Sequence, residues 1–159
     1  MGQDDEALVL AQRCRVLQLR FMQHLPHDAL LLARIHLART EEAEAREQFR
    51  WVQEECRPDR TDASIDVMLD LLSLLLSDMS NGQPIDSFAQ SSRWDSLIQR
   101  AQHGLLQEQM IEVFWWRARQ ALQNEQHELA QQMRERALAL LSDAPIWKNR
   151  LDYLSVEPR

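Results

Sequence analysis

The sequence predicts an all-α protein, and three observations support this. The 159 residues include only three glycines and five prolines, and the commonest residues, Ala, Leu, Arg, Glu and Gln, are good helix formers. Apolar residues recur at spacings of three and four, without the alternation typical of strands. The segment from Ile111 to Ser142 reads as a helical hairpin, with small residues at Ala118, Ala130 and Ala137 where two backbones approach closely. We expect one domain over residues 1–159, built from seven or eight helices in antiparallel hairpins.

The first expected helix runs from Asp4 to His24. Asp4 and Asp5 suit its N-terminus, where carboxylates are favoured by the helix dipole. Leu25-Pro26 ends it, because the residue before a proline avoids helical backbone angles. Helical spacing assigns five residues to its buried face: Leu10, Cys14, Leu17, Phe21 and Met22.

Two further helices follow. One is expected from about Asp28 to Arg39, with apolar residues at Leu31, Leu32, Ile35 and Leu37. The next is expected to begin at the Thr40-Glu41-Glu42-Ala43 turn, with Thr40 as its N-cap, and to continue to about Cys56. Residues 57–59 close it.

The fourth helix, Asp62 to Met79, is the most apolar. Its polar residues are three or four apart and therefore form one stripe, which consists of Asp62, Asp66, Asp70, Ser73 and Ser77. A helix with a single polar stripe packs on most of its surface. The stripe can be its one hydrated face, or it can bind a cation or a basic peptide.

The remaining elements are expected from residue 86 onwards, after the Ser80–Pro84 loop. Residues 86–102 are irregular, with a helix in their second half, and Gly104 breaks or bends this segment. Helices are then expected over residues 106–123 and 125–141, with a short final helix from Pro145 through Tyr153.

The segment Ile111–Ser142 resembles a tetratricopeptide repeat. Phe114 matches the large aromatic of the repeat's first helix, and the small positions of the two helices are occupied by Ala118, Ala130 and the Ala137-Leu138 pair. The sequence departs from the family pattern at Arg117, Arg134 and Asn124-Glu125.

A weaker match spans Pro26 to Arg57, with Ala33, Ala45 and Phe49 at the family positions; a register shifted by two, using Ala43, fits nearly as well. Residues 30–79 and 140–150 also look like helical-repeat regions of bacterial signal-transduction ATPases and related transcription activators. The resemblance implies a short superhelix of stacked hairpins.

In such a superhelix, first helices line a concave groove that binds partners. The resemblance places nine residues in this groove: His27, Leu30, Arg34, Leu37, Glu112, Trp115, Arg119, Leu122 and Gln123. Arg34 and Arg119 occupy equivalent positions, and arginines beside apolar surface suit an acidic peptide or a terminal carboxylate. Trp115 and Trp116 point about 100° apart, so we expect one to be packed and the other to lie at a second interface, with either a neighbouring helix or a partner.

Enzymatic chemistry is not indicated. The sequence contains no phosphate-binding glycine loop, no H-E-x-x-H and no G-x-S-x-G. His24 and His27 straddle Pro26, and a metal site there would lack further ligands. A net charge of −7 argues against nucleic acid. We therefore expect no cofactor, no metal and no enzymatic activity.

The N-terminus is acidic where a secretory signal would be basic, and no apolar run is long enough to span a bilayer. We expect a cytoplasmic protein with two buried thiols, Cys14 and Cys56. The leading hypothesis is a protein- or peptide-binding module with a regulatory or adaptor role in a bacterial signalling or transcription system. The alternatives are a sensor domain that binds a small effector and a self-associating structural domain, such as a homodimer.

Overall fold

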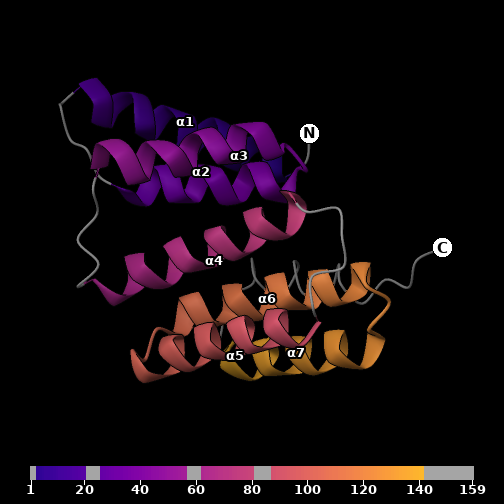
Figure 1. The fold of residues 1–159 in the computed structure, drawn as a ribbon. Coiled ribbons are helices and arrows are strands. Elements are labelled where there is room, and N and C mark those ends of the chain that lie inside the picture. The colour runs from indigo at the N-terminus through magenta and orange to yellow at the C-terminus, as the bar shows by residue number, and fades with distance from the viewer. Residues whose placement is uncertain (1–2, 21–25, 57–61, 81–86, 142–159) are drawn as a thin grey trace. The chain divides into compact units, whose positions relative to one another are not determined.

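The computed structural model describes residues 3–20, 26–56, 62–80 and 87–141 (Figure 1). These residues form seven α-helices and one π-helical turn, with no strand among them, so the all-α prediction is confirmed. The expected final helix from Pro145 to Tyr153 lies outside the described residues, as does most of the Ser80–Pro84 loop. The elements are α1 (Gln3–Arg20), α2 (Pro26–Ala38), α3 (Glu42–Trp51), the π-helical turn η1 (Val52–Cys56), α4 (Ala63–Ser80), α5 (Ser87–His103), α6 (Gln107–Gln123) and α7 (His127–Leu140).

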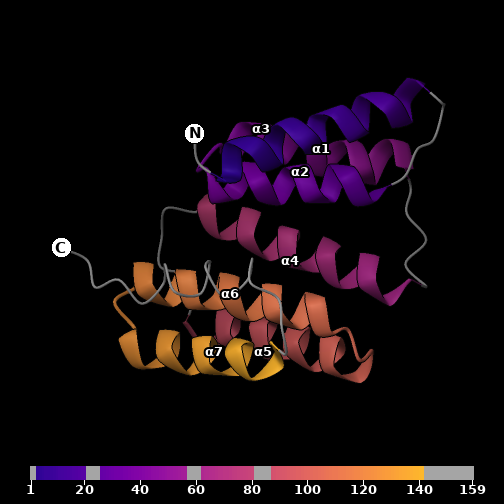
Figure 2. The same ribbon diagram turned by 180° about the vertical axis from the view of Figure 1, so that it is seen from behind.

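The chain divides into two compact units, Met1–Ile85 and Asp86–Arg159. In the first unit, α2 packs against α1, α3 and α4, and α3 also contacts α4 (Figures 1 and 2). In the second unit, α6 packs against both α5 and α7. The α2–α3 and α6–α7 pairs are the two hairpins that the sequence predicts most directly. The expectation of a single domain stays a prediction.

Three interhelical turns share one backbone geometry. Their central residues, Thr40, Leu105 and Glu125, have φ values of 63°, 53° and 59°. In each turn the N–H of the central residue donates to the carbonyl three residues earlier, as Thr40 does to Leu37 (3.1 Å). The next N–H donates to the carbonyl five residues earlier, as Gln126 does to Ala121 (2.8 Å). This pair of bonds is a Schellman motif, which satisfies carbonyls left over at the end of a helix.

The residue after each left-handed residue is the N-cap of the next helix. Glu41, Leu106 and Gln126 occupy the N-cap positions of α3, α6 and α7 with similar backbone angles, and none of their side chains makes a capping hydrogen bond. The prediction that Thr40 caps α3 is therefore wrong. Thr40 lies in the left-handed region instead, and its hydroxyl donates to the carbonyl of Arg39 at 2.5 Å.

Helix α1 buries a different face from the one expected. Leu10 and Leu17 are 61% and 52% exposed, and Cys14 is exposed as well. The buried side consists of Ala11 with Ala7 and Leu8 packed beside it against Leu32 and Ile35 of α2. The small side chains of Ala7 and Ala11 let the two backbones approach, whereas Leu10 and Leu17 lie outside. The expectation that Cys14 is a buried thiol is wrong; Phe21, Met22 and the Cys56 side chain are outside the described part.

Helix α4 agrees with its sequence pattern. Asp66, Asp70, Ser73 and Ser77 are half-buried, whereas the residues between them are buried. Asp62 Oδ1 accepts hydrogen bonds from the backbone N–H groups of Ser64 (2.9 Å) and Ile65 (3.3 Å). These bonds cap the helix at the position that the sequence gives for its start.

The alanines on which the hairpin predictions depend are buried. Ala118 and Ala137 are fully buried, and Ala130 is 5% exposed. In the α2–α3 hairpin Ala45 is fully buried, whereas Ala43 is exposed. Of the two alanines that the sequence offers for the small position of this helix, Ala45 is therefore the buried one.

Candidate functional site

The predicted groove residues of α2 differ in accessibility. His27 is exposed, Arg34 is half-buried, and Leu30 and Leu37 are buried. The two leucines belong to the core of the first unit, because α2 is covered by three neighbouring helices. Only His27 and Arg34 of this set present accessible surface.

The predicted groove residues of α6 lie in the second unit. Glu112, Arg119 and Leu122 are half-buried, Gln123 is exposed and Trp115 is buried. The rings of Trp115 and Trp116 meet edge to face with centroids 4.7 Å apart, and both residues are 6% exposed, so neither ring is accessible to a partner.

The Arg119 guanidinium lies 5.6 Å and 5.5 Å from the centroids of the Trp115 and Trp116 rings. Trp116 Nε1 approaches Glu112 Oε1 at 3.5 Å. On the α5 side, Trp94 is fully buried, with the Arg117 guanidinium 5.3 Å from its ring centroid. These aromatic residues are therefore buried, and the cation–π contacts add to their packing.

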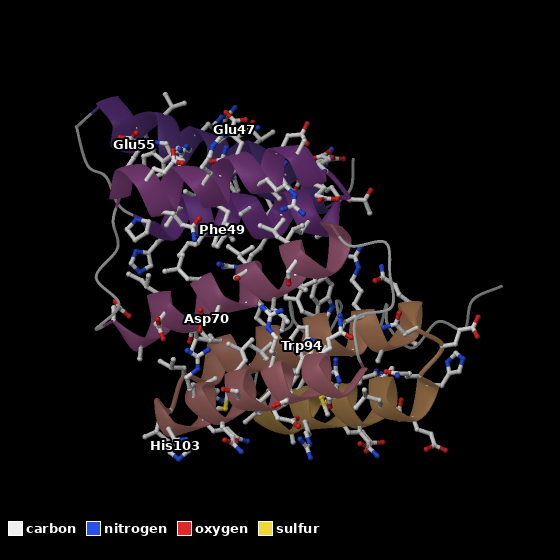
Figure 3. All side chains as sticks on the ribbon, viewed as in Figure 1. Glu47, Phe49, Glu55, Asp70, Trp94 and His103 are labelled. Atoms are coloured by element: carbon white, nitrogen blue, oxygen red, sulfur yellow. The ribbon has the colours of Figure 1, made fainter. Side chains whose placement is uncertain are left out.

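The first unit contains a cleft between α3 and α4, which we call the α3–α4 cleft. Its volume is about 610 Å³, within the range usual for ligand sites. Figure 3 labels Phe49 and Glu47 along α3. The lining residues are Ala43, Arg46, Glu47, Phe49, Arg50 and Gln53 on one side and Ser73, Leu76 and Ser77 of α4 on the other.

Arg46 links the two walls of the α3–α4 cleft. Its Nε donates to Glu42 Oε1 at 2.7 Å, one helical turn earlier. Its Nη2 donates to the carbonyl of Leu76 at 2.6 Å, near the C-terminal end of α4, where a cation is favoured by the helix dipole. The guanidinium is thus hydrogen-bonded to both α3 and α4.

Arg50, Ser73 and Ser77 provide the other polar groups of the cleft. Arg50 lies one turn beyond Arg46, is exposed, and pairs with no carboxylate among the described residues. Ser73 is half-buried and makes no hydrogen bond to a described residue, whereas Ser77 Oγ donates to the carbonyl of Leu74 at 2.8 Å. The cleft therefore offers a cation and a hydroxyl beside the apolar side chains of Phe49 and Leu76.

Two pairs of residues in the sequence indicate this cleft, although neither pair belongs to the repeat pattern. Arg46 and Arg50 are four apart on the third helix, and Ser73 and Ser77 are four apart within the polar stripe of the fourth. Residues four apart lie on one face of a helix, so each pair forms a ridge. That the two ridges face one another depends on the packing of α3 against α4, which spacing alone does not specify.

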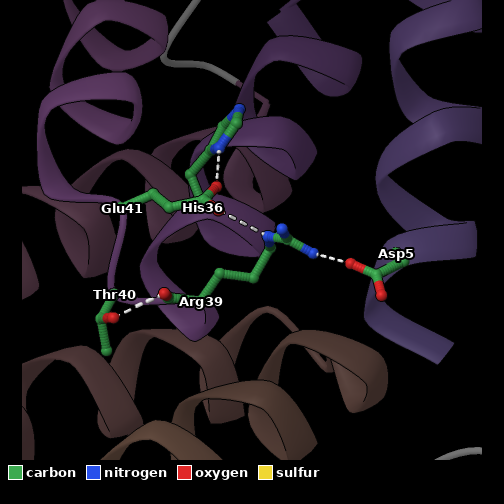
Figure 4. Close-up of polar contacts among 5 residues, drawn as sticks. All are labelled: Asp5, His36, Arg39, Thr40 and Glu41. Carbon is green, nitrogen blue, oxygen red and sulfur yellow. Dashed lines mark hydrogen bonds and ion pairs between the residues drawn. The ribbon is translucent and has the colours of Figure 1, made fainter. Parts of the chain in front are cut away.

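A second polar cluster lies at the α2–α3 turn (Figure 4). His36 Nδ1 lies 2.7 Å from Glu41 Oε2, and Arg39 Nε donates to Glu41 Oε1 at 2.8 Å. Arg39 also forms an ion pair with Asp5 of α1. The hydrogen bonds from His36 and Arg39 lower the pKa of Glu41, and those to Glu41 and Asp5 raise the pKa of Arg39. This cluster attaches α1 to the hairpin turn.

Within the described ranges, no helix combines the length and apolarity needed to cross a bilayer. The same residues bring together no group of three His, Cys, Asp or Glu side chains that could hold a metal ion. No family model, curated protein or solved structure matches this chain.

Proposed function

We propose that the chain is a peptide-binding module of the helical-repeat type, and that the α3–α4 cleft binds an acidic segment of a protein partner. The observation that carries this proposal is the position of Arg50 beside the apolar surface of Phe49 and Leu76. A carboxylate of the segment would pair with Arg50, and the Ser73 hydroxyl would be a further donor. An adjacent apolar side chain of the segment would pack on Phe49 and Leu76.

The resemblance to tetratricopeptide repeats is consistent with this role, because such repeats recognise peptides and perform no chemistry. A regulatory or adaptor function in a bacterial signalling or transcription system follows from the same resemblance and is part of the proposal. Glu47 at the cleft favours segments in which acidic and apolar residues alternate over those that are acidic throughout, because an excess of carboxylates would be repelled there.

The proposal is tested with three fluorescein-labelled peptides of equal length, in which leucine alternates with Asp, Asn or Lys. Fluorescence anisotropy with the intact protein should show the Asp peptide binding most tightly, and added salt should weaken that binding. Arg50→Glu should weaken it roughly tenfold, because it replaces an attraction by a repulsion.

Arg136→Glu is the matched control, since Arg136 is an exposed arginine on α7 and does not line the cleft. Equal affinities for the Asp and Asn peptides would contradict the proposal. Equal losses of affinity for the Asp peptide in Arg50→Glu and Arg136→Glu would also contradict the proposal, because such losses would reflect the net charge of the protein alone.

A further inference from the structure

The exposed face of α1 carries apolar residues beside one positive and one negative charge. Val9, Leu10, Val16 and Leu17 are 41%, 61%, 64% and 52% exposed, and Glu6 and Arg13 are exposed on the same side. We call these six residues the outer strip of α1. The opposite side of the helix, with Ala7 and Ala11, packs against α2.

The outer strip repeats with a spacing of seven residues. Glu6 and Arg13, Val9 and Val16, and Leu10 and Leu17 are each seven apart, which is two turns or about 10.5 Å along the helix axis. Neither Glu6 nor Arg13 pairs with another described residue. The strip is therefore continuous and has no net charge, although the chain carries −7.

From this charge arrangement we infer that the outer strip of α1 is a homodimer interface, in which two copies of α1 pack antiparallel about a twofold axis. An axis midway between positions 9 and 10 places Glu6 of each copy opposite Arg13 of the other. The same operation places Val9 opposite Leu10 of the second copy. A twofold interface requires a self-complementary surface, and the Glu6–Arg13 part of the outer strip has this property, whereas Val16 faces Gln3 of the second copy in this register.

The charges also favour antiparallel over parallel helices, and a second copy of this chain over a different partner. In a parallel, in-register pair, Glu6 would oppose Glu6 and Arg13 would oppose Arg13, which is unfavourable. Two chains of net charge −7 repel one another, and a neutral, self-complementary strip is a surface on which they can meet. One helix about 27 Å long buries less than the ~800 Å² per partner of a standard interface, so the dimer is weak and its population depends on concentration.

Sedimentation equilibrium of the full chain over a wide range of protein concentration tests the inference. The wild-type protein should pass from monomer to dimer as concentration rises. Arg13→Glu and Glu6→Arg should each weaken the dimer roughly tenfold, because two attractions become two repulsions. The double variant E6R/R13E restores opposite charges in both pairs, so its dimer should approach wild-type affinity.

Both positions are exposed, so these variants should keep the wild-type circular dichroism spectrum and melting temperature. Oxidation of the exposed Cys14 is a further measurement. Antiparallel pairing about this axis separates the two Cys14 residues by about nine positions, or roughly 13 Å along the helix, so no disulfide should link the dimer.

Three outcomes would overturn the inference. The first is a wild-type protein that is monomeric at all concentrations, as expected if a different protein covers the strip. The second is a double variant whose dimer is no tighter than those of the single variants, which would indicate another pairing register. The third is efficient Cys14–Cys14 cross-linking, which requires parallel helices or an antiparallel register other than the one inferred.

Discussion

Glu41 is joined to His36 by both its backbone and its side chain. Its N–H donates to the His36 carbonyl at 2.9 Å, and its Oε2 lies 2.7 Å from Nδ1 of the same residue. Since an ionised carboxylate can only accept, Nδ1 carries the proton in this contact. The α2–α3 turn is therefore fixed by a Schellman motif and by a side-chain bond between the same two residues.

The first prediction concerns acid stability. The pKa of Glu41 is lowered from its ordinary value of 4.5 by His36 and then Arg39, so the unfolded chain binds more protons between the two pKa values. The contribution of Glu41 to stability is therefore complete above about pH 4.5 and is lost as the pH falls through the lowered value. Urea unfolding as a function of pH should show this loss.

Glu41→Gln should lower the free energy of unfolding at neutral pH and reduce its decline in acid, because no carboxylate remains to be protonated. The matched control is Glu44→Gln, which removes an exposed carboxylate on the same helix that has no partner among the described residues. Identical pH dependence in the two variants would show that the His36–Glu41–Arg39 contacts do not stabilise the fold.

The second prediction concerns the left-handed turn residues. Leu105 has a φ of 53° and is 86% exposed, so its side chain contributes little packing while its backbone conformation is unfavourable for a residue with a Cβ atom. Leu105→Gly should raise the free energy of unfolding by about 1 kcal/mol. Leu105→Ala keeps the Cβ atom and should not stabilise; an equal gain in both variants would mean that the strain is absent.

Most helices could be located from the sequence because their apolar residues recur at helical spacing and few residues interrupt them. The exception is α5, which is one helix over Ser87–His103 although a helix was expected only in the second half of this segment. α6 and α4 lie within one residue of the predicted bounds. The turns were harder to predict. A left-handed residue is normally glycine, but here Thr40, Leu105 and Glu125 take this conformation, so residue type gave no signal and α3 was given the wrong cap.

Which face of a helix is buried was predictable only where one face is clearly more polar. The polar stripe of α4 gave the correct result, with Asp70 and Ser73 on its accessible side. In α1 both faces are apolar, and the choice between the leucines and the alanines depends on how closely α2 approaches. The α3–α4 cleft likewise depends on helix packing, which residue spacing does not determine.

The third prediction tests the small-residue contacts. Ala137 is fully buried, whereas Ala139 on the same helix is exposed. Ala137→Leu should destabilise the protein by about 2 kcal/mol because three further carbon atoms must fit a filled interior. Ala139→Leu should change stability by less than about 0.5 kcal/mol. Thermal or urea unfolding distinguishes the two, and equal effects would contradict close packing at position 137.

The last prediction concerns the attachment of α1. The Arg15 guanidinium carbon lies 3.9 Å from the centroid of the Trp51 ring, and Asp5 pairs with Arg39. The apolar contact of α1 with α2 is made by Ala7, Leu8 and Ala11, of which only Leu8 has a large side chain, so its packing energy is low. Such a helix should open locally more often than a helix with large buried residues.

Hydrogen exchange measured by mass spectrometry should therefore be faster in α1 than in α4, whose leucines are buried. Arg15→Met keeps an aliphatic side chain but loses the cation–π contact, and it should speed exchange in α1 roughly threefold. Arg136→Met, the charge-loss control on α7, should leave α1 unchanged. If Arg15→Met accelerated exchange equally in every helix, α1 would open only with global unfolding, and the contacts of Arg15 and Asp5 would not set its local stability.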